Sequence, residues 1–449
     1  MKVSKYTFLY DIENKEFYVY NTLSNALIEI DEESYSLLNK YKQSEIVPEQ
    51  EFDKELYTIL CVRNILTEND DDDYLKYKAF IMQMRCQQTN MHLTIAPTMD
   101  CCFRCHYCFE KYKEPKYMTP EVMNRIIKYV TSCRDLKNIK ITWFGGEPLM
   151  AVPQIEEFYD RFNAVWKEPF NSNIITTGYH IDEESIRVMK KVGITSAQIT
   201  LDGMKETHNK VKFLSSGEDV FERVVSNMEL LNNLAPEINI VIRVNLTLEN
   251  AHEYVLLCNF YQERFKRRKN INIAPAFVLD RGGSNCDTCR QKSILFNHSD
   301  RSKFILDLNS NGYDSPFIRY PDLFFNECAI RNQMAIAFDP EGCAYKCWEV
   351  IGNKEYAIGK LNDDGILTDI NQTILNRQLY GADTFDDPTC SQCKYLPICS
   401  GGCPIQRIQN KFENGHNNYC IHYKGFMSEF LRAHIMRKKA QEAAVEKQQ

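Results

Sequence analysis

Three cysteines stand close together near residue 100. Cys101, Cys105 and Cys108 have the spacing CxxxCxxC. Thiolates at this spacing on one loop can bind three irons of a [4Fe–4S] cluster and leave the fourth iron open to a small molecule. A zinc site is the alternative, but zinc-binding loops usually carry paired CxxC spacings. Cys102 lies outside this spacing and is interpreted as a packing thiol.

A second group of cysteines lies in the last third of the chain. It contains the pattern CxxCxxxxxCxxxC, two cysteines upstream and one downstream, at Cys328, Cys347, Cys390, Cys393, Cys399, Cys403 and Cys420. Closely spaced thiols in a chain without an export signal indicate metal ligation or redox chemistry rather than disulfides. A zinc ribbon is the alternative here, because CxxC pairs are common zinc ligands.

The sequence WFGGEP holds two glycines and a carboxylate, at Gly145, Gly146 and Glu147. Glycines permit a close approach of the backbone to a ligand, and the carboxylate could accept hydrogen bonds from an ammonium group. The motif follows the second of the strands expected below. Taken alone, it could equally be an ordinary turn.

Together, CxxxCxxC and GGEP resemble the radical S-adenosylmethionine (SAM) superfamily. The resemblance implies that Cys101, Cys105 and Cys108 bind a [4Fe–4S] cluster whose open iron chelates SAM, and that a reducing electron then yields the 5′-deoxyadenosyl radical. It also implies that Tyr107 lies by the adenine. The expected contacts with the rest of SAM are assigned to Gly145, Gly146, Glu147, Thr200 and Arg243.

Some of these assignments are open at the level of sequence. Thr200 is a candidate for a ribose or carboxylate contact, whereas Arg243 could instead form a structural ion pair. Relatives often carry a histidine and then an arginine after their LDG segment, which here is Leu201-Asp202-Gly203, but this chain continues with His208 and the two lysines Lys210 and Lys212. Because lysine keeps the charge and lacks the bidentate fork of arginine, no role is assigned there. No catalytic acid or base is predicted.

The seven later cysteines resemble the SPASM domain, which carries two auxiliary [4Fe–4S] clusters. The resemblance assigns the outer cluster to Cys390, Cys393, Cys399 and Cys420. It assigns the inner cluster to Cys328, Cys347 and Cys403. The inner cluster then lacks a fourth ligand, which could come from Cys343, Cys286 or Cys289, or its iron could be open to substrate.

Strands and helices alternate between residues 91 and 275. Expected strands are 92–96, 139–144, 173–177, 197–201, 238–245 and 271–275, and expected helices are 119–133, 153–166, 183–192, 220–234 and 252–264. The order predicts an α/β fold with a partial (β/α)6 TIM-like barrel, whose site lies at the carboxyl ends of the strands. After about residue 310 this alternation is lost.

The chain is divided into three expected domains. Residues 1–88 predict a hairpin followed by helices, residues 89–310 the radical SAM partial barrel, and residues 311–449 the SPASM domain with a C-terminal helix. The first domain resembles the winged-helix-like recognition module of peptide maturases, in which a leader peptide adds a strand to a sheet edge.

Composition limits the partners. The chain has 449 residues and a net charge of −7, which is not the basic balance of nucleic-acid-binding proteins. No apolar run approaches the ~18 residues of a membrane span, and the first residues have no signal-peptide pattern. We therefore expect a cytoplasmic protein with neither a nucleic acid nor a membrane as its partner, in which many of the 18 cysteines serve metal chemistry.

These features predict a radical SAM peptide maturase with SAM and three [4Fe–4S] clusters. It would abstract hydrogen from a ribosomally made precursor peptide with a leader sequence and form an intrapeptide crosslink, with an external electron donor. The alternatives are an anaerobic sulfatase-maturase-like enzyme and a non-catalytic peptide-binding relative. Sulfatase maturases typically have glutamine directly before GGEP, where this chain has Phe144. They also typically have aspartate directly after the cysteine that corresponds to Cys347, where this chain has Trp348.

Overall fold

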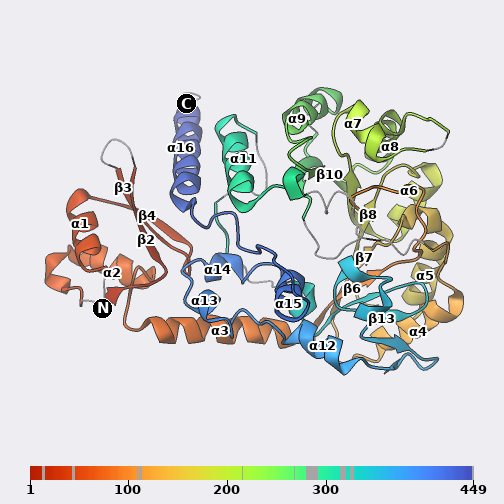
Figure 1. The fold of residues 1–449 in the computed structure, drawn as a ribbon, viewed down its shortest axis with the longest axis horizontal. Helices are drawn as coiled ribbons and strands as arrows, with labels where there is room; N and C mark the ends of the chain where they lie inside the picture. Colours follow the sequence, from red (N-terminus) through yellow and green to blue (C-terminus); the bar gives the residue numbers. More distant parts are fainter. Residues whose placement is uncertain are drawn as a thin grey trace.

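The computed structural model describes residues 1–12, 16–42, 46–108, 110, 114–214, 216–266, 268–279, 292–313, 320–323 and 328–446. Figure 1 shows a small N-terminal module on one side and a large sheet with its helices on the other. The long helix α3 (Asp70–Cys86) runs from the first part to the second, and the cysteine-rich C-terminal segment lies between them.

The larger part is built on a ten-stranded sheet of order β11-β10-β9-β8-β7-β6-β12-β13-β14-β15. Its parallel strands include β6 (Asn90–Ile95), β7 (Asn138–Trp143), β8 (Phe170–Thr176), β9 (Ile194–Thr200), β10 (Asn239–Leu246) and β11 (Ile271–Phe277). Every second residue of β6 is buried, at Met91, Leu93 and Ile95, as the two-residue period of a strand requires.

Helices alternate with these strands along the chain. They are α4 (Pro120–Thr131), α5 (Val152–Val165), α6 (Glu183–Lys191), α7 (Lys205–Val211), α8 (Val220–Leu234) and α9 (Glu253–Arg264). All six strands and all five helices expected between residues 91 and 275 are present, with ends displaced by a few residues. The α/β class with a central sheet of parallel strands is thereby confirmed.

The sheet continues beyond the strands that the sequence predicted. Strand β12 (Ala335–Phe338) pairs in parallel with the outer side of β6, and antiparallel strands follow it at β13 (Cys343–Tyr345), β14 (Gly359–Leu361) and β15 (Leu367–Thr368). The alternation of strands and helices is lost after residue 310, as expected, but these additional strands of the sheet were not predicted. Strands of two to four residues are too short to show a two-residue period in the sequence.

The N-terminal module has its own small core. Strands β2 (Thr7–Ile12), β3 (Glu16–Asn21) and β4 (Ala26–Ile30) form an antiparallel sheet, and β1 (Lys2–Val3) pairs with β5 (Leu66–Thr67). Helices α1 (Glu32–Lys40) and α2 (Lys54–Val62) complete the module. Val19, Leu38 and Leu60 are fully buried in one apolar cluster, which joins the sheet to both helices.

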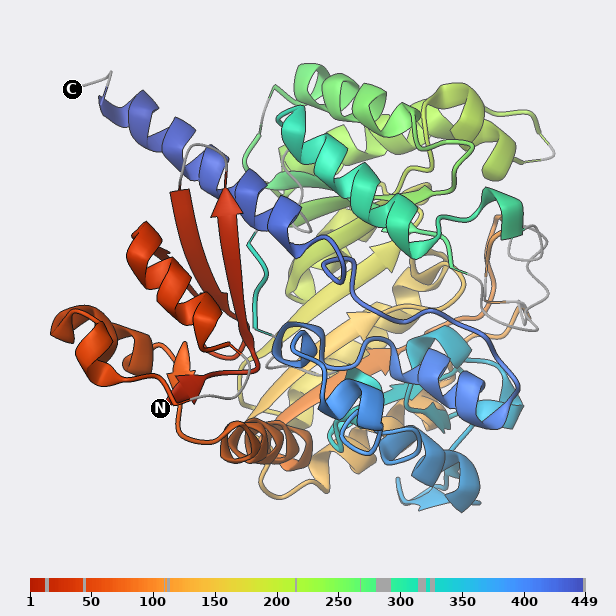
Figure 2. The same ribbon diagram turned by 60° about the vertical axis from the view of Figure 1, so that its left-hand side comes forward.

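The cysteine-rich segment contains short helices and is followed by a long one. Helix α11 (His298–Ser310) precedes the segment. Within it lie α12 (Gln372–Leu379), α13 (Pro388–Ser391), α14 (Leu396–Cys399) and α15 (Pro404–Phe412), and the long α16 (Met427–Glu446) follows. Helix α16 lies beside the N-terminal sheet in both ribbon views (Figure 2), where Ile435 packs with Ile12 and Tyr18.

Helix α3 is also attached to the C-terminal segment. Arg85 forms an ion pair with Asp383 in which both side chains are only 6% exposed, and Tyr77 packs against Phe385. Helix α3 and the C-terminal segment are thus held together by contacts between residues that are distant in sequence. Within the described ranges, no helix combines the length and apolar character that crossing a membrane requires.

Candidate functional site

A cavity of about 360 Å³ opens at the carboxyl ends of the parallel strands. Eight of the nine residues that the sequence assigns to SAM and its cluster lie on its wall, at Cys101, Cys105, Tyr107, Cys108, Gly145, Gly146, Thr200 and Arg243. They come from the loop after β6, the loop after β7, the end of β9 and β10. The fold therefore brings together residues that are up to 142 positions apart, while their individual roles stay predictions.

Gly145 and Gly146 are required because a side chain at either position would clash with the backbone of the same chain. Gly145 has φ +116°, and a Cβ atom there would lie 2.4 Å from the Thr98 carbonyl oxygen. At Gly146 a Cβ atom would lie 2.0 Å from the Asp100 carbonyl oxygen. Thus the GGEP loop packs directly on the backbone that leads into the cysteine loop, which is a different close approach from the one to a ligand that the sequence suggested.

Glu147 is the predicted residue that does not line the cavity. It is fully buried, and its carboxylate accepts hydrogen bonds from the Leu149 amide at 3.0 Å, the Thr176 hydroxyl at 2.6 Å and the Thr177 amide at 2.7 Å. These bonds tie the loop after β7 to the end of β8. The geometry makes Glu147 a positioning residue, and its expected contact with an ammonium group stays a prediction.

Tyr107 belongs to a buried polar network that the sequence did not indicate. Its hydroxyl donates to Asp202 at 2.6 Å and accepts from Lys212 at 2.8 Å and from Asn245 at 3.1 Å. Lys212 also donates to Asp202, and these two side chains are 2% and 1% exposed. Burial alone would raise the pKa of Asp202, but the charge of Lys212 and the hydrogen bonds outweigh it, so the pKa is lowered.

The network extends to the strand ends that carry the predicted SAM contacts. Asn245 donates to Asp202 at 3.0 Å and accepts from Arg243 Nε at 3.0 Å. Arg243 is in turn the cross-strand neighbour of Thr200. In the sequence, only Asp202 and Lys212, ten residues later, point to this ion pair. A buried lysine cannot be distinguished from an exposed one without the fold.

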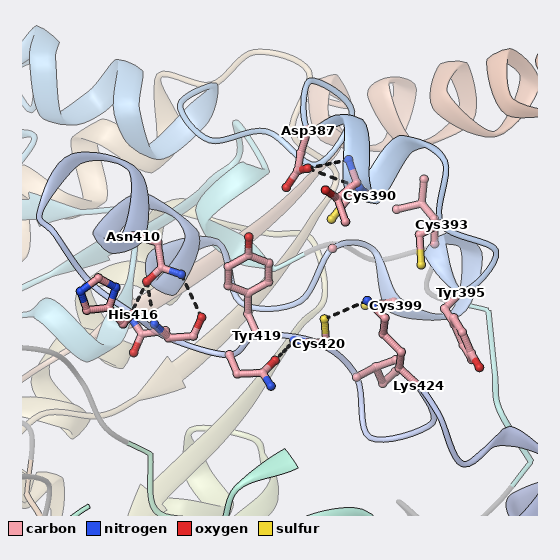
Figure 3. Close-up of a pocket in the computed structure, with 16 residues that line it drawn as sticks. Asp387, Cys390, Cys393, Tyr395, Cys399, Asn410, His416, Tyr419, Cys420 and Lys424 are labelled. Carbon is pink, nitrogen blue, oxygen red and sulfur yellow. Dashed lines mark hydrogen bonds between the residues drawn. The ribbon is translucent and has the colours of Figure 1, made fainter. Parts of the chain in front are cut away.

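A second cavity, of about 320 Å³, lies among the short C-terminal helices (Figure 3). All four cysteines assigned to the outer cluster line it, at Cys390, Cys393, Cys399 and Cys420. Two cations face this set, since Arg407 donates to Cys390 Sγ at 3.2 Å and Lys424 donates to Cys420 Sγ at 3.5 Å. Burial raises the pKa of Cys390, and the charge of Arg407 opposes this rise, which favours the thiolate.

Arg407 is itself held in place. Its Nη2 donates to Asp387 at 2.9 Å, and its guanidinium lies over the Tyr419 ring at 4.7 Å from the ring centre. Within the described residues, no three His, Cys, Asp or Glu side chains are grouped closely enough to hold a single metal ion. Four thiols line this cavity, and the positively charged side chains of Arg407 and Lys424 donate to two of them. This arrangement suits a larger, anionic group such as an iron–sulfur cluster.

The three cysteines assigned to the inner cluster also lie together. Cys403 packs on the apolar cluster that contains Cys347. Burial raises the pKa of Cys347 well above its usual value, with further increases from the charges of Glu349, Cys328 and Cys403.

One candidate for the fourth ligand is engaged elsewhere. Cys343 lies in a separate apolar cluster with Ala96 and Phe144, and its Sγ accepts a hydrogen bond from Lys354 at 3.3 Å. This geometry does not favour Cys343 as a ligand of the inner set. The other two candidates, Cys286 and Cys289, lie outside the described residues.

Comparison with known proteins agrees with the geometry of the first cavity. Residues 95–261 match the model of the Radical SAM superfamily. The radical SAM cyclopropyl synthase TigE of Paramaledivibacter caminithermalis is 21% identical and covers 92% of this chain and 91% of its own length. A cysteine-type anaerobic sulfatase-maturating enzyme of Clostridium perfringens is 24% identical and covers 75% of this chain and 95% of its own length.

Two solved structures share the fold. The sulfatase-maturating enzyme anSMEcpe with bound AdoMet and the Cp18Cys peptide has a TM-score of 0.59 at 19% identity, covering 79% of this chain and 99% of its own. SuiB of Streptococcus suis bound to the precursor peptide SuiA has a TM-score of 0.50 at 16% identity, covering 93% of this chain and 99% of its own.

Proposed function

We propose that this chain, which belongs to the radical SAM superfamily, modifies a peptide or protein by radical chemistry. The observation that carries this proposal is the cavity at the strand ends, whose wall holds the whole CxxxCxxC set together with Gly145, Gly146, Thr200 and Arg243. Similar proteins that cover three quarters or more of the chain are a cyclopropyl synthase and sulfatase-maturating enzymes.

The cavity residues have separable tasks. Cys101, Cys105 and Cys108 would hold a [4Fe–4S] cluster, which with bound SAM supplies the 5′-deoxyadenosyl radical. Thr200 and Arg243 offer a hydroxyl and a guanidinium to the ribose and carboxylate of SAM.

An aromatic wall faces these polar groups. Phe144 and Trp348 pack edge to face at 5.0 Å between ring centres, and both line the cavity. These rings give one side of the cavity an apolar surface, which would limit the access of water to a radical formed there.

The finer form of the proposal is a maturase of a ribosomally made precursor peptide that forms an intrapeptide crosslink. TigE and SuiB cover more than nine tenths of this chain, and SuiB binds the precursor peptide SuiA. In the module, β2 and β4 are the outer strands of the three-stranded sheet. An outer strand can accept an added strand from a leader peptide, which supports the winged-helix-like recognition role of residues 1–88.

The C-terminal cysteines support two auxiliary clusters. Four thiols line one cavity and three others lie together beside Glu349, as the SPASM assignment requires. With the cluster of the CxxxCxxC loop this makes three [4Fe–4S] clusters, which need an external electron donor to be reduced. Iron and sulfide analysis after anaerobic reconstitution is expected to find about 12 irons per chain, whereas about 4 irons would contradict the auxiliary clusters.

Sulfatase maturation is the second candidate, and the comparisons support it equally. The cysteine-type anaerobic sulfatase-maturating enzyme from Clostridium perfringens is 24% identical, and the solved structure of anSMEcpe contains the bound peptide Cp18Cys. Trp348 after Cys347 speaks against this activity, because an aspartate is typical there.

One experiment separates the candidates. The reconstituted full chain is incubated anaerobically with SAM, dithionite and either a precursor peptide encoded beside its gene or a sulfatase-derived peptide. We expect 5′-deoxyadenosine in both reactions and a mass change in the precursor alone. A formylglycine product would establish the sulfatase-maturase alternative, and the absence of 5′-deoxyadenosine from a cluster-replete sample would establish a non-catalytic relative.

A further inference from the structure

A buried cation lies at the end of the short helix α7, next to the cysteine loop. Lys212 is 2% exposed, and its ammonium group donates to Tyr107 Oη at 2.8 Å and to Asp202. Lys212 also lies 5.4 Å from the centre of the Tyr107 ring and lines the first cavity. Tyr107 stands between Cys105 and Cys108 in the sequence, so this cation is attached to the middle of the CxxxCxxC loop.

We infer that Lys212 is a positioning residue that holds a fixed positive charge against the cysteine loop and thereby raises the reduction potential of its [4Fe–4S] cluster. The inference rests on the proposed function. It assigns Lys212 a task in electron uptake, which is separate from the binding of SAM or of a substrate.

The orientation of the ion pair supports this inference. Lys212 lines the cavity on whose wall Cys101, Cys105 and Cys108 also lie, and Asp202 is not among the residues of that wall. The positive member of the pair therefore faces the cavity of the cysteine loop, and Asp202 lies behind it.

Several contacts hold Asp202 in that position. Its carboxylate accepts from Asn245 at 3.0 Å, its backbone carbonyl accepts from Asn250 at 2.7 Å, and its amide donates to His208 Nδ1 at 3.1 Å. These partners come from β10, from the loop after it and from α7. Because the anion cannot move, the cation paired with it is fixed as well.

The charge of Lys212 is retained at neutral pH. Burial opposes ionisation, but the charge of Asp202 and the hydrogen bond to it outweigh this effect, and the pKa of Lys212 is raised well above its usual value. A charge that is screened by little water acts on its neighbours more strongly than one on the surface. A nearby positive charge stabilises the more negative, reduced state of an iron–sulfur cluster, so it raises the potential.

The test is a redox titration of the reconstituted full chain without SAM. At each potential, the EPR signal of the cluster on the CxxxCxxC loop measures how much of that cluster is reduced. Variant C105A, which removes a ligand of this cluster, identifies its signal among those of the proposed auxiliary clusters. Against the unmodified chain we compare K212M, K212M together with D202N, K212R, and K210M. Lys210 is exposed on the same helix and provides a matched control.

We expect K212M to lower the ratio of reduced to oxidised cluster at a fixed potential by about tenfold, which corresponds to about 59 mV for a one-electron couple. The double variant should lower this ratio by less, because it also removes the opposing charge of Asp202. K212R and K210M should stay close to the unmodified chain. The double variant guards against misfolding, because it leaves no unpaired charge in the interior.

The outcomes separate the inference from the proposed function. Equal potentials in all variants, with the cluster intact, would overturn the inference alone. A loss of SAM affinity in the double variant with an unchanged potential would also overturn it, since Lys212 would then be a SAM-binding residue. A chain that takes up no [4Fe–4S] cluster on the CxxxCxxC loop would overturn the inference and the proposed function together.

Discussion

The two cavities are lined by cysteines but are built in different ways. The first cavity lies at the ends of parallel strands whose side chains form one large apolar core, with Leu93, Ile141 and Ile199 each 1% exposed or less. The second lies among helices of four to nine residues, α13, α14 and α15. The first cavity is therefore formed by the main sheet and its core, whereas the second is formed by short helices that bury few apolar residues of their own, such as Leu396 and Ile398.

The charges around the thiols differ in the same way. In the first cavity the cation Lys212 is buried, paired with Asp202 and attached to Tyr107 rather than bonded directly to a thiol. In the second, Arg407 and Lys424 donate directly to cysteine sulfurs. The comparison indicates that the first cavity is a reactive centre whose surroundings are fixed by the fold. It indicates that the second is a structural or electron-carrying centre whose bound group orders the helices around it.

The largest expected effect follows from removing a ligand of the first cavity. In C105A the [4Fe–4S] cluster of this loop should be lost, and 5′-deoxyadenosine formation should fall below detection in an anaerobic assay with SAM and dithionite. About 8 of about 12 irons should remain, because the C-terminal cysteines are untouched. C102A is the control and should keep full activity; an active C105A variant would refute the assignment of the loop.

Removing a ligand of the second cavity should instead unfold its surroundings. In C399A we expect backbone amide exchange in α13, α14 and α15 to accelerate about tenfold or more, because binding of a metal group contributes the folding free energy of such segments. Exchange in β6, β7 and β9 should not change. Hydrogen–deuterium exchange with mass spectrometry reads both regions in one sample. Equal protection of α14 in C399A and in the unmodified chain would contradict this contrast.

The scaffold of the first cavity can be broken without touching a cysteine. In G146A the added Cβ would meet the Asp100 carbonyl oxygen at 2.0 Å, so the backbone of the loop must shift. We expect a loss of about 3 kcal/mol or more of unfolding free energy, together with loss of SAM binding, measured by urea unfolding and equilibrium dialysis.

A second glycine serves as the control for this variant. Gly193 has a positive φ, +69°, which Gly146 does not, but a Cβ at Gly193 has open space around it. G193A should therefore cost about 1 kcal/mol and leave SAM binding intact. Equal costs at the two glycines would show that the close approach at Gly146 is unimportant.

The smallest effect concerns pH and the first cavity. His208 is fully buried, and burial together with the charge of Lys212 lowers its pKa to about 3. Since the unfolded chain takes up a proton near pH 6.5 and the folded chain does not, stability falls as the pH falls through this range. Between pH 7 and 5.5 we expect a loss of about 1.4 kcal/mol from this group, measured by urea unfolding.

The matched variant is H208Q, whose side-chain oxygen can still accept from the Asp202 amide. Its loss of unfolding free energy between the same two pH values should be smaller by about 1 kcal/mol. A variant with the same pH dependence as the unmodified chain would show that His208 does not titrate in this way.

Local patterns determined much of this protein. The parallel strands and their helices follow from apolar residues at periods of two and 3.6, which act within a single element. The CxxxCxxC and GGEP motifs predicted one cavity, since parallel strands end at the same edge of a sheet. The C-terminal spacing likewise predicted the four thiols that line the second cavity.

The tertiary structure decided what depends on contacts between distant residues. Only the fold shows that Glu147 is bonded within its own chain, that Cys343 pairs with Lys354, and that Lys212 is buried against Asp202. It also decides that β12 joins the edge of β6. A single sequence does not state which polar groups lose water on folding. That loss gives each buried charge its partner and determines which residues can act on the cysteine loop.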